Sequence, residues 1–114
     1  MTILEIFEKV NLVTPIEQRR FFNFFEDTVN ELQSLYGDFG DFVFIKGMEY
    51  TPPKKLTDDN VVLPLYHNAI VDNILFLITN EENYKGEFIR KSNDAYHKYW
   101  NDNAKDRRKR RMRW

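Results

Sequence analysis

The sequence predicts a mainly α-helical fold: a small helical bundle of three to four helices, with a short β-hairpin or extended loop inserted and a basic C-terminal tail. Apolar residues recur at helical spacing in four stretches, which indicates amphipathic helices. One short stretch of aromatic and β-branched residues near glycines indicates a strand. With 114 residues, of which 42% are hydrophobic, the chain supports one core. We therefore expect a single domain over residues 1–104 and a tail over residues 105–114.

Two helices are predicted in the N-terminal third of the chain. A short amphipathic helix is expected over residues 3–10. A longer helix is expected to begin at Thr14, which suits an N-cap, with Pro15 at the first helical position and Glu17 completing a capping box. Gly37 is expected to end this helix. Its apolar face consists of Phe21, Phe22, Phe24, Phe25, Val29, Leu32, Leu35 and Tyr36.

The sequence in the middle of the chain predicts the inserted β-hairpin or extended loop. Residues 42–45 are aromatic and β-branched and indicate a strand. We expect Val61 and Val62 to pair with this strand. The connection between them, Gly47 to Asp59, contains two adjacent prolines and is too long for a tight hairpin. Loops of this kind in small domains are often functional, so we expect it to contact another protein chain.

The third predicted helix opens at Leu63 and Pro64 and runs to about Asn80. Its apolar residues surround nearly the whole circumference, so we expect the most buried helix of the bundle. Asn73 projects into this apolar surface and needs a hydrogen-bond partner, either a loop carbonyl within the monomer or a polar contact at a subunit interface. The predicted polar strip consists of Asn68, Asp72 and Thr79.

The last predicted helix begins near residues 81–83, where acidic side chains suit the positive end of a helix dipole. One broad face carries aromatic residues as far as Tyr99 and Trp100, and no residue stops the helix before the basic tail.

Charge is distributed very unevenly along the chain. Residues 105–114 carry seven basic groups and one acidic group, which leaves ten basic and 17 acidic groups for residues 1–104. The body therefore has a net charge of -7 and the tail one of +6. This division predicts a docking tail for an acidic protein surface or for nucleic acid.

Signals for catalysis, cofactors and metals are absent from the sequence. The two histidines are 30 residues apart and form no metal-binding motif; we expect His97 at the surface and His67 in a structural or interface position. The chain has no cysteine and no glycine-rich phosphate loop. The longest apolar run has five residues, too few to span a membrane. The sequence therefore predicts neither an enzyme nor a membrane protein.

The apolar faces of two helices are wider than so short a chain can cover alone. We therefore expect part of the aromatic surface to be buried by another chain. The expected subunit interface consists of Phe24, Tyr50, Lys54 and Lys55.

The order of these elements resembles that of the head-to-tail connector, or adaptor, proteins of tailed bacteriophages. The resemblance covers about residues 14–100. It rests on the Leu35-Tyr36-Gly37 turn, the β segment with a long loop, the Leu63-Pro64 entry into a helix containing Tyr66, Ala69 and Ile70, and the tyrosine-rich last helix.

The resemblance implies a structural subunit in the neck of the virion, assembled in the host cytoplasm. Such subunits form a homo-oligomeric ring, for example a dodecamer, which docks on the portal protein and other tail or neck proteins. Genomic DNA would pass through the ring without specific binding, and no cofactor is implied. We expect weak self-association in isolation, because the acidic bodies repel one another. The expected partner-binding residues are Tyr99, Trp100, Arg107, Arg108, Lys109, Arg110, Arg111, Arg113 and Trp114.

An alternative hypothesis is a small nucleic-acid-binding regulatory protein. In that hypothesis, residues 105–113 form an electrostatic arm and Trp114 stacks on a base. In either hypothesis the dense positive charge predicts a tail that is poorly ordered alone and becomes ordered on its partner.

Overall fold

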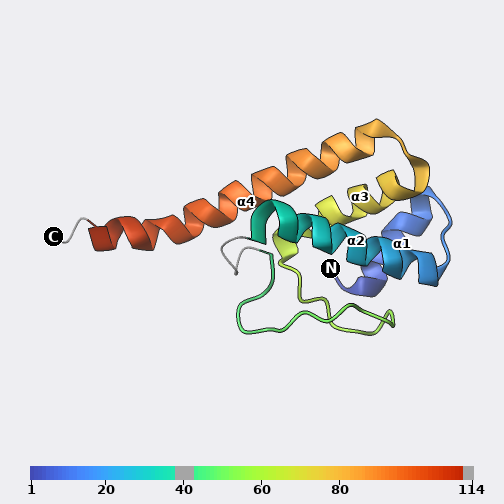
Figure 1. Cartoon of the computed structure of the whole chain (residues 1–114), viewed down its shortest axis with the longest axis horizontal. Coiled ribbons are helices and arrows are strands. Elements are labelled where there is room, and N and C mark those ends of the chain that lie inside the picture. Colours follow the sequence, from blue (N-terminus) through green and yellow to red (C-terminus); the bar gives the residue numbers. More distant parts are fainter. Residues whose placement is uncertain (38–42, 112–114) are drawn as a thin grey trace.

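Helices account for most of the computed structural model, which describes residues 1–37 and 43–111, with side chains as far as Asn101. The helices are α1 (Ile3–Val13), α2 (Gln18–Tyr36), α3 (His67–Thr79) and α4 (Glu82–Arg111), and a short 3-10 helix, η2 (Pro64–Tyr66), leads into α3. Helix α3 contacts α1, α2 and α4, and Figure 1 shows it in the middle of the bundle. The prediction of a mainly helical bundle is confirmed.

Helix α1 begins at a capping box, and Asn11 in its last turn contacts the connection to α2. The Thr2 hydroxyl accepts a hydrogen bond from the Glu5 N–H (3.1 Å), and the Glu5 carboxylate accepts one from the Thr2 N–H (3.4 Å). At the other end, the Asn11 amide donates to the Phe7 carbonyl (3.0 Å), and its oxygen accepts from the Ile16 N–H (3.1 Å). Asn11 therefore fixes the turn that leads into α2.

The predicted start of the second helix at Thr14 is wrong. The N-cap is Glu17, which makes no side-chain capping bond, and the first helical residue is Gln18. The Thr14 N–H instead donates to the Val10 carbonyl (3.0 Å), so Thr14 closes α1. Its extended backbone is the conformation favoured before a proline. A threonine before a proline suits both the end of one helix and the start of the next. Here Thr14 belongs to the end of α1.

Helix α3 is the central helix that the sequence predicted. Seven of its 13 residues are buried, a larger share than in α1 or α2. Ile70 and Ile74 are fully buried, and Leu77 is half-buried. Asp72, which the sequence predicts on the polar strip of this helix, is nevertheless only 9% exposed. Helix α4 covers this side of α3, and the Lys91 ammonium lies 2.6 Å from the Asp72 carboxylate.

The inserted segment contains much less β structure than predicted. An isolated antiparallel bridge joins Phe44 to Val62, and the described residues contain no β-strand. Hydrogen bonds of 2.8 Å flank the bridge, from the Ile45 N–H to the Val61 carbonyl and from the Leu63 N–H to the Val43 carbonyl. Gly47 has a φ of +83° and turns the chain directly after the bridge, which ends the pairing. The segment is an extended loop, and predicted strand residue Phe42 lies outside the described residues.

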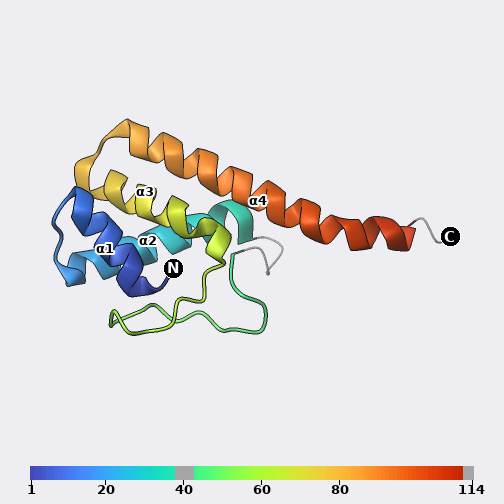
Figure 2. The same ribbon diagram turned by 180° about the vertical axis from the view of Figure 1, so that it is seen from behind.

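A tight turn connects α3 to α4. Asn80 adopts the left-handed conformation (φ 58°), and its N–H donates to the Phe76 carbonyl (2.7 Å). This geometry ends α3 and reverses the chain, so that α4 runs back along α3 (Figures 1 and 2).

Helix α4 continues well past the end of the bundle. Its 30 residues correspond to about 45 Å of helix at 1.5 Å per residue. The molecule measures 57 × 29 × 20 Å, and both views in Figures 1 and 2 show the far end of α4 projecting alone. The predicted separate, poorly ordered tail is not supported: residues 105–111 continue α4 past the expected boundary at residue 104. Residues 112–114 lie outside the described part of the chain.

Candidate interaction surfaces

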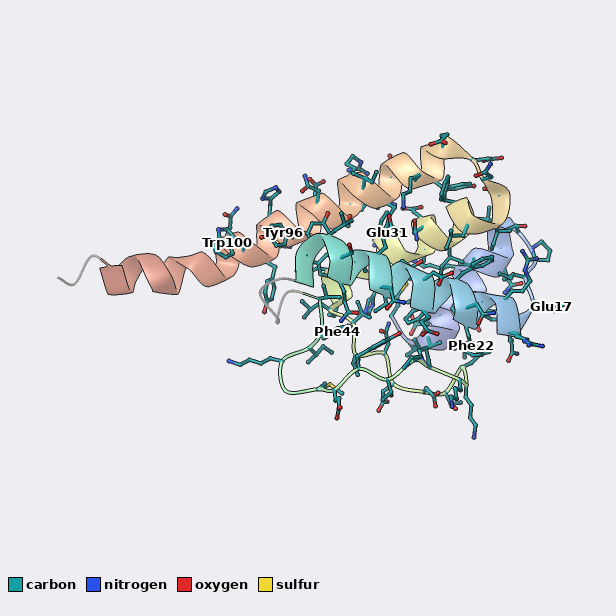
Figure 3. All side chains as sticks on the ribbon, in the orientation of Figure 1. Glu17, Phe22, Glu31, Phe44, Tyr96 and Trp100 are labelled. Atoms are coloured by element: carbon teal, nitrogen blue, oxygen red, sulfur yellow. The ribbon has the colours of Figure 1, made fainter. Side chains whose placement is uncertain are left out.

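Helix α4 leaves the bundle at a cluster of tyrosines. The Tyr36 ring at the end of α2 stacks on Tyr96 of α4 and on Tyr66 of η2, with centroid distances of 4.9 and 5.9 Å. The Tyr36 hydroxyl is also hydrogen bonded to the Ser92 hydroxyl (3.1 Å). Figure 3 shows Tyr96 and Trp100 on α4 where it passes the end of α2. These contacts hold α4 to the bundle directly before its projecting part.

Two predicted partner-binding residues, Tyr99 and Trp100, belong to this junction. Both are partly buried, and both already make contacts within the chain. Neither side chain is therefore fully available to a partner.

Beyond the junction, residues 105–111 form what we call the basic arm. It contains six basic residues and one acidic residue, and its backbone is the last part of α4. Its side chains lie outside the described residues, as do those of the remaining predicted partner-binding residues, Arg113 and Trp114. The backbone places Arg107, Arg108, Lys109, Arg110 and Arg111 together on the projecting end of α4.

A groove runs between α2 and the inserted loop. It has a volume of about 490 Å³, and Phe22 and Glu26 of α2 face Pro53 and Lys54 of the loop across it. The sequence predicts Lys54 at an interface, whereas Phe22 is not among the predicted interface residues. The signal for Phe22 was the width of the aromatic face of α2, which is too broad for the core alone.

The other predicted interface residues do not form one continuous surface with this groove. Phe24 is two residues from Phe22, or about 200° around the helix, and the Arg20 guanidinium lies 5.4 Å from its ring centroid. Lys55 is exposed, and its N–H donates to the Asp58 carboxylate (3.0 Å).

Tyr50 is a structural part of the loop. Its ring stacks on Phe44 with a centroid distance of 4.9 Å. The buried hydroxyl finds no hydrogen-bond partner among the described residues. Burial raises the pKa of Tyr50 to about 12, and the nearby Glu26 carboxylate contributes in the same direction. Tyr50 therefore packs within the inserted segment and against the hydrophobic core, and it offers little free surface to a partner.

A second depression lies between the start of α1 and the loop. This acidic hollow has a volume of about 550 Å³, and its lining includes Leu4, Glu5, Leu56, Asp58 and Asp59. Backbone N–H groups that donate to Asp58 lower the pKa of its carboxyl, so this group is negatively charged at neutral pH. The predicted sites did not include these residues, because α1 and the loop are 50 residues apart and only the fold brings them together.

His67 has the structural position that the sequence predicted. It is 4% exposed, and its Nδ1 lies 2.7 Å from the amino group of Met1. Its Nε2 lies 2.8 Å from the Val62 carbonyl, to which it donates, and 3.2 Å from the Asn60 amide. Burial lowers the pKa of the His67 imidazole, so the neutral ring is favoured. His97 is exposed on α4.

The described residues bring no three histidine, aspartate or glutamate side chains together as a metal-binding group. Within the same part of the chain, each helix is too short or too polar to span a membrane. A comparison with protein-family models finds no match, and comparisons with curated proteins and with solved structures find no similar chain.

Proposed function

We propose that this protein is a non-enzymatic structural subunit of a bacteriophage head-to-tail connector. Copies of the chain form a ring in the virion neck, dock on the portal protein and continue the DNA channel toward the tail. The observation that carries the proposal is the construction of α4, which is held to the bundle at one end and presents six basic residues on its projecting end.

The way α4 is held favours a docking role. Tyr36 stacks on Tyr96 and is hydrogen bonded to Ser92, so the direction of the projecting helix relative to the bundle is fixed. A preorganised arm loses less conformational entropy on binding than a flexible tail of the same charge. Arginine side chains also form bidentate pairs with carboxylates, which gives an acidic protein surface both affinity and orientation.

The rest of the molecule is compatible with a ring around DNA. Residues 1–104 have a net charge of -7, which opposes binding of phosphate groups and allows a duplex to slide past. The groove between Phe22 and Lys54 gives a neighbouring subunit or tail component an apolar floor with a charged rim.

Docking on a portal ring can be tested by co-sedimentation. The variant Arg107→Ala/Arg110→Ala removes two charges from the basic arm, and we expect it to bind the ring much more weakly than the unmodified chain. The control Lys9→Ala/Lys46→Ala removes two charges from exposed positions on the body and should bind normally. Both variants should melt near the temperature of the unmodified protein, because exposed charges contribute little to folding stability. Equal binding by both variants would refute docking through the arm.

Binding of nucleic acid is a second candidate function. It is favoured by the charge density of the arm, because a projecting helix with six basic residues in seven also suits a DNA groove or an RNA backbone. In this case the unmodified chain should bind short duplex or single-stranded DNA with a steep dependence on salt. Removal of each basic residue that binds a phosphate should lower the slope of log K against log salt by about 0.7 to 0.9.

The two candidates predict different results for the same variant. If Arg107→Ala/Arg110→Ala reduces portal binding and the chain has no salt-dependent affinity for DNA, the connector proposal is supported. If the variant binds the portal ring normally and loses a salt-dependent affinity for DNA or RNA, the nucleic-acid function replaces it.

A further inference from the structure

The basic arm and the acidic hollow lie at opposite ends of the molecule. The hollow is formed by the start of α1 and residues 56–60, close to the N-terminus. Figures 1 and 2 show α4 pointing away from this region in both views. Because residues 105–111 are part of a continuous helix, the arm of one molecule cannot fold back onto its own hollow.

We propose that the acidic hollow is the docking site for the basic arm of a second copy of this chain. The proposal rests on the connector function and names the contact that joins neighbouring subunits. The charges of the two surfaces argue for this occupant. The arm carries six basic residues and one acidic residue, and the hollow presents the carboxylates of Glu5, Asp58 and Asp59 against one positive group, the amino group of Met1.

The chemistry of the hollow fits such an occupant. Leu4 is 42% exposed, and together with Leu56 it gives the hollow an apolar part on which the methylene groups of arginine or lysine can pack. One oxygen of Asp58 accepts the N–H groups of Lys54 and Lys55 (2.8 and 3.0 Å). A carboxylate has two oxygens and about four acceptor positions, so Asp58 retains acceptor capacity for a guanidinium group.

The symmetry of this contact has a structural consequence. The arm of one copy binds the hollow of the next, so the two surfaces are different and the contact is head-to-tail. Contacts of this kind close into a ring when the rotation allows it and otherwise extend as a filament. They do not form a closed symmetric dimer. The contact is mainly ionic and exposed, so it is weak in isolation and weakens further as salt is added.

Sedimentation velocity of the full chain over a range of concentrations tests the proposal. At low salt we expect concentration-dependent self-association beyond a dimer, and at about 0.5 M salt we expect the monomer, since the Debye length is then shorter than about 5 Å. Asp59→Lys and Arg110→Glu should each weaken the association about two- to fivefold, as for exposed ion pairs. Asp59 is exposed and is chosen because its change leaves in place the hydrogen bonds that the Asp58 and Glu5 carboxylates accept.

The charge-swapped variant Asp59→Lys/Arg110→Glu is the decisive experiment. It should associate more tightly than the product of the two single effects predicts, because the opposite charges are restored across the contact. The control Asp27→Lys reverses an exposed charge on α2, outside the hollow, and should associate like the unmodified chain. An association that is insensitive to salt, a closed dimer, or equal effects of Asp59→Lys and Asp27→Lys would each overturn the proposal.

Failure of this inference can be distinguished from failure of the connector function. If Asp59→Lys associates normally but Arg107→Ala/Arg110→Ala no longer binds the portal ring, the arm docks on the portal alone. If the arm variant binds the ring normally while both single reversals weaken self-association, the subunit contact stands and the portal contact lies elsewhere.

Discussion

The side-chain amide of Asn73 donates a hydrogen bond of 2.9 Å to the hydroxyl of Thr28, which joins α3 to α2 inside the core. Both residues are fully buried. The Thr28 hydroxyl in turn donates to the Phe24 carbonyl (2.8 Å), and the Asn73 oxygen accepts from the Lys85 ammonium (3.1 Å). Lys85 also forms an ion pair with Glu31. The partner of Asn73 is therefore neither a loop carbonyl nor a second subunit but a polar network that links α2, α3 and α4.

Replacing Asn73 by leucine should destabilise the protein by about 1 to 3 kcal/mol. The change leaves the Lys85 ammonium without one acceptor and removes the donor to the Thr28 hydroxyl, and buried polar groups without partners cost about this much. The control Asn68→Leu changes the same residue type at an exposed position of α3. Urea unfolding of both variants measures the difference. Similar stability losses would show that the network contributes nothing specific.

The pH dependence of stability should depend on His67. Burial lowers the pKa of this imidazole in the folded state, so protonation favours the unfolded chain. The contribution of His67 is fully present above the unfolded pKa of about 6.5 and is lost as pH falls through the lower folded pKa. The N-terminal amino group of Met1 opposes protonation of the ring, and the Glu5 carboxylate favours it.

Urea unfolding at intervals between about pH 7.5 and pH 5 measures this dependence. We expect the unmodified protein to lose stability over this range and His67→Gln to show a flatter profile. His97→Gln, at an exposed position on α4, should retain the slope of the unmodified protein. Parallel profiles for all three proteins would contradict the prediction.

The hydroxyl groups of Tyr66 and Tyr36 should contribute differently to the stability of the fold. Tyr66 is fully buried, and its hydroxyl finds no hydrogen-bond partner in the described part of the chain. Tyr66→Phe should therefore be neutral or stabilising, since an unsatisfied polar atom is removed. Tyr36→Phe removes the hydrogen bond to Ser92 and should cost about 1 kcal/mol. Thermal unfolding of the two variants side by side gives the comparison, and the opposite order would refute it.

Ile74 should be among the most sensitive positions of the core. It is fully buried in α3, and truncation to alanine should cost about 2 to 5 kcal/mol, because apolar burial decreases and a cavity remains. Leu12→Ala is the matched control, because Leu12 is 86% exposed at the end of α1. We expect the control to change the free energy of unfolding by less than about 0.5 kcal/mol. A loss at Ile74 no larger than the one at Leu12 would disprove the central position of α3.

The candidate surfaces divide between those that the sequence could predict and those that it could not. The basic arm was predictable because charge density along the chain needs no tertiary information. Lys54 was predictable as an exposed loop residue, but Phe22 was not separable from the core aromatics of the same helix. The acidic hollow combines α1 with residues 56–60, and a contact between segments so distant in sequence cannot be derived from local patterns.

The sequence by itself determined the helical class, the central position of α3 and the C-terminal ends of α2 and α3. These features follow from apolar periodicity and from Gly37 and Asn80, whose effects act within a few residues. Only the tertiary structure decided that Thr14 closes α1 instead of opening α2, that the predicted hairpin is a single bridge, and that Asp72 is buried against Lys91. The bridge and the Asp72–Lys91 ion pair depend on contacts with a distant segment, which local sequence patterns do not specify. At Thr14 two local preferences compete, a cap for α2 and the extended conformation before Pro15 with a hydrogen bond to Val10, and the second prevails.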